Sequence, residues 1–147
     1  MVIATYPTFG YSQKSLPEKL GYKPELSIVF IALPHSLEEL PDTVDFAKVA
    51  RRQDWSRPIG PNHFDMMHAF SSSRAEIAAG LPKLLRYLNP RGAIWLSWPK
   101  KTAKVQTDLT EDVVRSEALK LGLVDIKVAA IDTTWSGLKL VQRLVSA

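Results

Sequence analysis

The chain has 147 residues, of which 46% are hydrophobic and 23% are charged, and its formal net charge at pH 7 is +4. This is the composition of an ordinary globular protein, and we expect one domain over residues 1–147. The absence of cysteine excludes disulfides, thiolate zinc sites, iron–sulfur clusters and a cysteine nucleophile. The glycines are too widely spaced for Gly-x-Gly-x-x-Gly or a Walker phosphate loop.

The sequence carries no signal for a membrane or for export. No apolar run reaches the eighteen residues or so that a membrane span needs. The first fourteen residues lack the basic segment and apolar stretch of a secretory signal. We therefore expect a cytoplasmic protein that does not bind a membrane.

The first third of the chain predicts a short helix and a buried strand. Pro17 suits the first turn of a helix over Leu16–Leu20, and Gly21 suits its end. The nearly continuous apolar run Leu26–Leu33 is typical of a strand that is buried on both faces of a parallel sheet.

The next segment predicts weaker elements. Ser36 and Glu39 have the spacing of a capping box, which predicts a helix that Pro41 ends after little more than one turn. A weak strand follows at Thr43–Val49, and the basic stretch Arg51–Asn62 is a loop because of its prolines and glycine.

A strand over Phe64–Phe70 and a helix come next. Ser73 and Glu76 form a second capping box, and the helix carries apolar residues on one face, namely Ile77, Leu81, Leu84, Leu85 and Leu88. Gly80 and Pro82 inside this helix predict a kink or two abutting helices.

The remaining elements are a strand, a helix and a hairpin. A turn at Asn89–Gly92 precedes a strand over Ala93–Trp98, and a polar loop over Lys100–Leu109 leads to a helix that runs from Thr110 to Gly122. The strands Leu123–Ile131 and Leu138–Leu144 are joined by too few residues for a parallel crossover, so they form an antiparallel hairpin. We predict an α/β, Rossmann-like, doubly wound and mostly parallel sheet with one antiparallel edge strand.

This order of elements resembles the class I methyltransferase fold. The segment Leu88–Trp98, LNPRGAIWLSW, is similar to the turn and strand that follow the pattern L-x-P-G-G-x-L in that superfamily. Five segments together also resemble an uncharacterised bacterial family of short Rossmann-like proteins, namely LGYKPELSIVFIALP, LSWPKK, TDLTEDVVR, GLVDIKVAAID and TWSGLKLV. The resemblance implies a small methyltransferase-like domain, and it supplies no catalytic or substrate-binding residues.

One departure from true methyltransferases concerns the cofactor. Their first turn is rich in glycine, whereas here the turn Leu33–Ser36 has none, and its side chains would crowd the amino-acid end of S-adenosylmethionine. Methyltransferases also have an acidic residue at the end of the second strand that binds the ribose of the cofactor. This residue is absent here unless Asp54 takes its role. We therefore expect no cofactor, with S-adenosylmethionine disfavoured.

Candidate binding residues follow the strands of the predicted sheet, where α/β proteins bind ligands. They are His35, Ser71, Ser72, Ser73, Lys100, Lys101 and Trp135. Hydroxyls, helix N-terminal amides and ammonium groups suit an anion. The alternative is that these residues are structural. In that case Ser73 caps the helix, the lysines are solvated, and Trp135 covers the end of the sheet.

Other polar residues are interpreted as structural. His68 shares a strand face with apolar residues and is expected in the core, and we predict no metal site. Arg51, Arg52 and Arg57 around Trp55 are more typical of a solvated surface than of an RNA-binding loop.

The sequence thus favours a non-enzymatic ligand-binding or regulatory module for a small anionic or nucleotide-like molecule. The first alternative is a divergent S-adenosylmethionine-dependent methyltransferase. The second is a protein-interaction module that uses the loop 99–110 and Trp135. The expected partner is a small anion or a protein, nucleic acid is not favoured, and the oligomeric state stays open.

Overall fold

The computed structural model describes residues 14–143. Leu144 of the predicted last strand, and residues 1–13 of the segment in which no export signal is predicted, lie outside the described residues. The helices are α1 (Leu16–Leu20), α2 (Arg74–Leu85) and α3 (Glu111–Leu119), with short 3-10 turns η1 (His35–Leu37), η2 (Leu40–Asp42) and η3 (Lys101–Ala103). The strands are β1 (Ser27–Ile31), β2 (Lys48–Arg52), β3 (Phe64–Phe70), β4 (Leu88–Pro99), β5 (Leu123–Ala130) and β6 (Trp135–Gln142).

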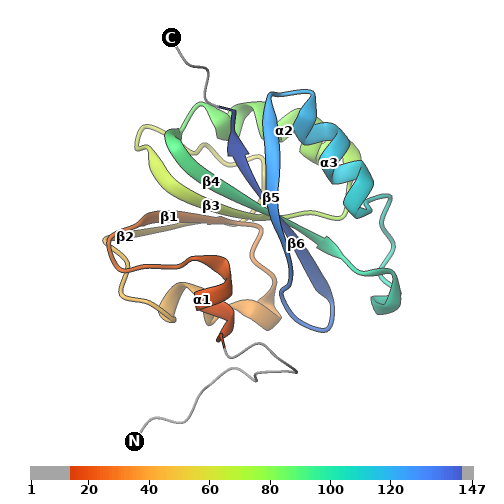
Figure 1. Cartoon of the computed structure of the whole chain (residues 1–147), viewed down its shortest axis with the longest axis horizontal. Helices are drawn as coiled ribbons and strands as arrows, with labels where there is room; N and C mark the ends of the chain where they lie inside the picture. The colour runs from red at the N-terminus through yellow and green to blue at the C-terminus, as the bar shows by residue number, and fades with distance from the viewer. Residues whose placement is uncertain (1–13, 144–147) are drawn as a thin grey trace, which may run out of the picture.

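The six strands form one sheet in the order β2-β1-β3-β4-β6-β5 (Figure 1). The pairs β1–β2, β1–β3 and β3–β4 are parallel, whereas β6 is antiparallel to both β4 and β5. The predicted α/β Rossmann-like class with a C-terminal antiparallel hairpin is confirmed. The predicted edge position of the antiparallel strand is wrong, because β6 lies inside the sheet and β5 forms the edge.

Helices cover both faces of the sheet, and each face has its own core. On one face α2 and α3 contribute Ile77, Leu81 and Val114 to a core with alternate strand residues. On the other face α1 and the turns η1 and η2 contribute Leu20, Leu37 and Leu40. Figure 1 shows α1 on the opposite side of the sheet from α2 and α3.

Two predicted elements in the first half differ from the structure. The helix expected from Ser36 is a pair of 3-10 turns, because Leu37 and Leu40 are three residues apart and point to one core, and Pro41 cannot continue an α-helix. The weak strand is displaced to Lys48–Arg52, so the first two arginines of the predicted loop belong to an edge strand beside β1.

The predicted turn at Asn89–Gly92 is a bulge inside β4. Phe64 pairs with Leu88 and Met66 pairs with Ala93, so the four residues 89–92 face only Asp65. The Asn89 side chain donates to the Asp65 carboxylate at 2.8 Å. A Cβ at Gly92 would lie 2.7 Å from the Asp65 carbonyl oxygen, so this close approach of two backbones requires glycine.

The helices depart from the predictions in smaller ways. α2 is a single helix across Pro82, whose neighbours Leu81 and Leu84 are anchored in the core. Its predicted apolar residue Leu88 belongs to β4 instead. α1 has a complete capping box between Ser15 and Glu18, which the sequence analysis missed. No helix within residues 14–143 is long and apolar enough to cross a membrane.

Candidate functional site

The sheet has a switch point where β1 and β3 lie side by side. From β1 the chain moves outward to β2, and from β3 it moves the other way to β4. Ligands of open α/β sheets bind beyond the carboxyl ends of the strands at such a position. The segments that follow β1, β2, β3 and β4 therefore define the candidate site.

The three serines after β3 form a compact hydrogen-bonded turn. Ser71 is buried, and its hydroxyl donates to Glu76 Oε1 at 2.6 Å and accepts from the backbone N–H of Ser73 at 3.1 Å. Ser73 caps α2 by accepting from the backbone N–H of Glu76. The predicted capping box is thus half present, because Glu76 bonds to Ser71 instead of the Ser73 backbone.

The loop that follows β4 in the chain, including residues 106–108, packs against this serine turn. Thr107 donates its hydroxyl to the Ser72 carbonyl oxygen at 2.7 Å, and Asp108 Oδ1 accepts from the backbone N–H of Arg74 at 2.7 Å. The predicted anion-binding end of α2 therefore already holds a carboxylate of the protein itself. α3 itself is capped by Thr110, whose hydroxyl accepts from the backbone N–H of Val113 at 3.2 Å.

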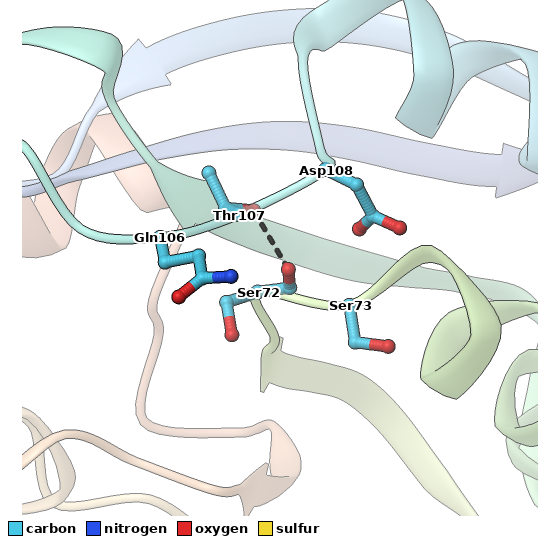
Figure 2. Close-up of a pocket in the computed structure, with 5 residues that line it drawn as sticks. All are labelled: Ser72, Ser73, Gln106, Thr107 and Asp108. Carbon is cyan, nitrogen blue, oxygen red and sulfur yellow. Dashed lines mark hydrogen bonds between the residues drawn. The ribbon is translucent and has the colours of Figure 1, made fainter.

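A polar cavity of about 450 Å³ lies between the turn and the docked loop. Its lining residues are Ser72, Ser73, Gln106, Thr107 and Asp108. Figure 2 shows Ser72 and Ser73 on one side and Gln106, Thr107 and Asp108 on the other. Hydroxyl, amide and carboxylate groups suit a polar ligand that has hydrogen-bond donors.

The other predicted binding residues do not line this cavity. The His35 side chain extends into solvent, 91% exposed, and its Nδ1 lies 3.0 Å from a carboxylate oxygen of Glu38. Lys100 uses its backbone N–H to bond Thr134, and the Lys101 side chain is exposed. Trp135 packs edge-on against Phe70, with ring centroids 5.3 Å apart, on the α1 side of the sheet. The predicted grouping of these four residues with the serines is not formed.

The turn after β1 has an unusual backbone. Ala32 has a φ of 57°, in the left-handed region that glycine adopts most easily. Its N–H donates to the Arg52 carbonyl oxygen at the end of β2, at 2.9 Å. The sequence lacks the glycines expected at this turn, yet the backbone takes a conformation that normally favours glycine.

Trp55 covers the switch point. It lies three residues beyond β2, and its indole Nε1–H donates to the carbonyl oxygen of Phe70, the last residue of β3, at 2.7 Å. Because β1 lies between β2 and β3, the chain from Arg52 to this indole reaches across the end of β1. From the sequence, Trp55 is only part of a basic loop, and Gly80 predicts a kink. The position of Gly80 in the middle of α2, where glycine disfavours helix, is explained instead by the indole that lies opposite it.

The histidine of β3 lies in the core and does not line the cavity. His68 is fully buried, with Nδ1 2.7 Å from the Tyr22 hydroxyl and Nε2 2.9 Å from the Ser97 hydroxyl. It stacks on Phe70 with ring centroids 4.4 Å apart. Burial lowers the pKa of His68 from 6.5 to about 3, so the ring is neutral near pH 7. The prediction of a core histidine is confirmed.

Solved structures of methyltransferases share this fold. Magnesium protoporphyrin IX methyltransferase from Synechocystis PCC 6803 with bound SAM matches with a TM-score of 0.62 and 13% identity over 87% of this chain and 76% of that one. The same enzyme with bound SAH gives 0.60 and 12% over 84% and 76%. The N-methyltransferase NodS from Bradyrhizobium japonicum WM9 gives 0.55 and 9% over 85% and 90%. No protein-family model and no curated protein matches the chain significantly.

These likenesses correct two predictions. The non-enzymatic ligand-binding or regulatory module and the absence of a cofactor are both wrong, because the matched folds are methyltransferases and one of them is seen with SAM and with SAH. The methyltransferase-like fold implied by the sequence resemblance is confirmed. The finer resemblance to one bacterial family stays a prediction.

Proposed function

We propose that this chain is an S-adenosylmethionine-dependent methyltransferase. The observation that carries the proposal is the sheet order β2-β1-β3-β4-β6-β5 with antiparallel β6 between β4 and β5, together with the likeness of the whole fold to several methyltransferases. The polar cavity beside the carboxyl ends of β3 and β4 supports it, because substrates of α/β folds bind at that edge.

The switch point itself does not fit the cofactor in the conformation described. Trp55 covers the end of β1. The turn that follows β1 contains Leu33 and Pro34, whereas a close approach of the cofactor to this backbone would need glycine. The nearest carboxylate beyond β2 is that of Asp54, whose side chain is 48% exposed and accepts from both the backbone N–H and the hydroxyl of Ser56.

Binding of S-adenosylhomocysteine, the product form of the cofactor, tests the proposal directly. Isothermal titration at millimolar ligand should give a saturable heat, and a ligand at a hundred times its Kd should raise Tm by about 5–11 °C. Replacing Asp54 by Ala should weaken binding if this carboxylate contacts the ribose hydroxyls. Asp42→Ala removes an exposed carboxylate from η2 and is the matched control.

Two outcomes would contradict the proposal. One is the absence of any heat or Tm shift with either S-adenosylmethionine or S-adenosylhomocysteine. The other is an equal shift with ATP, which would indicate a general nucleotide site without selection for the amino-acid end of the cofactor.

A further inference from the structure

Trp55 is held at the switch point by one hydrogen bond and one close contact with a glycine. The hydrogen bond is Nε1–H to the Phe70 carbonyl oxygen at 2.7 Å. The contact is with Gly80 of α2, where an added Cβ would lie only 2.4 Å from indole Cε3. No side chain at position 80 could coexist with the indole in this place, so the glycine provides the room that the indole occupies.

The loop on either side of Trp55 is anchored independently of the indole. Arg52 donates its guanidinium N–H groups to the carbonyl oxygens of Pro58 at 2.6 Å and of Ile59 at 3.1 Å. The Ile59 side chain is buried in the core beneath α2. Residues 56–58 are exposed. Trp55 can therefore leave by rotation of its side chain and local movement of residues 53–58, without unfolding the loop.

The place that the indole occupies has the properties of a site for a purine ring. It accommodates the edge of an aromatic ring beside Gly80, where a side chain would clash, and it offers the Phe70 carbonyl oxygen to a donor on that ring. The exocyclic amino group of adenine is a donor of the same kind. A flat heteroaromatic ring with an N–H at its edge could therefore make the same two contacts as the indole, one with Gly80 and one with the Phe70 carbonyl oxygen.

We propose that Trp55 is an internal occupant of the nucleoside site and competes with the adenine of the cofactor for the Gly80 surface and the Phe70 carbonyl oxygen. This inference rests on the proposed function, and it explains why the fold of a methyltransferase is seen with its switch point covered. Apparent affinity equals the intrinsic affinity multiplied by the fraction of molecules with Trp55 displaced. The residue thereby sets how tightly the chain holds an adenosyl ligand.

Two variants test the indole and the place that it occupies separately. Trp55→Ala removes the indole, whereas Gly80→Ala adds a methyl group 2.4 Å from the present position of indole Cε3, in the space that either ring would need. Trp55→Ala should bind S-adenosylhomocysteine about tenfold more tightly than the unmodified chain in isothermal titration, a change that corresponds to about 1.4 kcal/mol. Gly80→Ala should bind it more weakly, and the double variant should lose the gain of Trp55→Ala, because the methyl group blocks the surface beside position 80.

A structural readout accompanies the affinities. With 5-fluorotryptophan incorporated, the ¹⁹F resonance of Trp55 is the one that Trp55→Phe removes, and saturation with S-adenosylhomocysteine should shift it towards a solvent-exposed value. Arg51→Ala changes an exposed residue of β2 just before the loop and serves as the control for nonspecific loosening. It should leave both the affinity and the resonance unchanged.

Each other outcome overturns the inference. If the unmodified chain binds and Trp55→Ala binds equally or more weakly, Trp55 is not a competitor and the proposed function stands. If neither the unmodified chain nor any variant binds, the proposed function fails and the competition fails with it.

Discussion

At the scale of single residues, the buried ring of His68 can form hydrogen bonds but is unfavourable when it is protonated. His68 lies between two hydroxyls and among aromatic rings, and both ring nitrogens have a partner. Its neutral form has one donor and one acceptor nitrogen, which the Tyr22 and Ser97 hydroxyls can both satisfy. Protonation would bury a charge without a counter-ion, so the histidine supports the fold only while it is neutral.

The stability of the protein should therefore fall as the pH falls below about 6.5. The folded-state pKa of about 3 is lower than the unfolded value, so the unfolded chain binds more protons between these pH values. The expected contribution is a loss of about 1.4 kcal/mol in the free energy of unfolding per pH unit. Urea unfolding between pH 7 and pH 5 measures it.

Two variants separate this effect from that of the other titrating groups. His68→Gln keeps donor and acceptor groups but cannot titrate, so it should remove this slope. His63→Gln changes an exposed histidine and should leave it in place. An unchanged slope in His68→Gln would show that His68 is not the titrating group.

At the scale of elements, the helices on one face are tied together by polar side chains at their ends. Asp108 precedes α3 but accepts from the first N–H of α2. Arg74 of α2 donates to the nearly buried Glu117 of α3 at 2.9 Å, and Lys120 pairs with the same carboxylate. Lys120 and Arg74 lower the pKa of Glu117 by bonding to its ionised form. These contacts hold the loop 106–108 over the serine turn and so shape the cavity.

Removal of the Asp108 carboxylate should loosen that connection. Asp108→Ala should lower the free energy of unfolding by about 1 kcal/mol, because an N-terminal amide of α2 loses its acceptor. Asp108→Asn should cost less, since the amide oxygen still accepts. Chemical denaturation measures both, with Asp45→Ala, an exposed carboxylate before β2, as the control. Equal effects of Ala at positions 108 and 45 would contradict this cap.

At the scale of the whole molecule, the excess of positive charge is unevenly placed. Lys127 and Lys139 are cross-strand partners on β5 and β6, and Lys127 donates to the carbonyl oxygen of Lys19 at the end of α1. Burial, Lys14 and Lys19 lower the pKa of Lys127, while burial, Lys127 and Lys23 lower that of Lys139. Within residues 14–143 none of these five lysines forms an ion pair. Like charges opposite one another in a sheet are unfavourable.

Salt should therefore stabilise the protein near pH 7. Raising sodium chloride from 0.05 to 0.5 M screens this repulsion and should raise Tm by about 2–4 °C, the equivalent of about 1 kcal/mol. Lys139→Gln should raise Tm at low salt by a similar amount and reduce the salt effect. Lys83→Gln on the exposed side of α2 is the control. If Lys139→Gln responds to salt as the unmodified chain does, the repulsion is too weak to matter.

Local patterns in the sequence determined much of the architecture. Apolar runs such as Leu26–Leu33 and Phe64–Phe70, and stop signals such as Gly21 and Gly122, predict the elements because burial and backbone freedom act over a few neighbouring residues. The short link 132–137 between the two predicted strands likewise predicts the antiparallel hairpin. The class of the fold and the core position of His68 followed from such patterns.

Only the tertiary structure decided which side chains meet at the strand ends. Asp108 reaches α2 across 34 residues of sequence, and Trp55 reaches Phe70 across 15. Neither contact leaves a periodic signal in the sequence, because each is made by a single side chain. Each also depends on which strands are neighbours in the sheet. For the same reason only the serines of the predicted group lie together, whereas His35, the two lysines and Trp135 do not join them. Trp55, placed by the sheet order over β1, was recognised only in three dimensions.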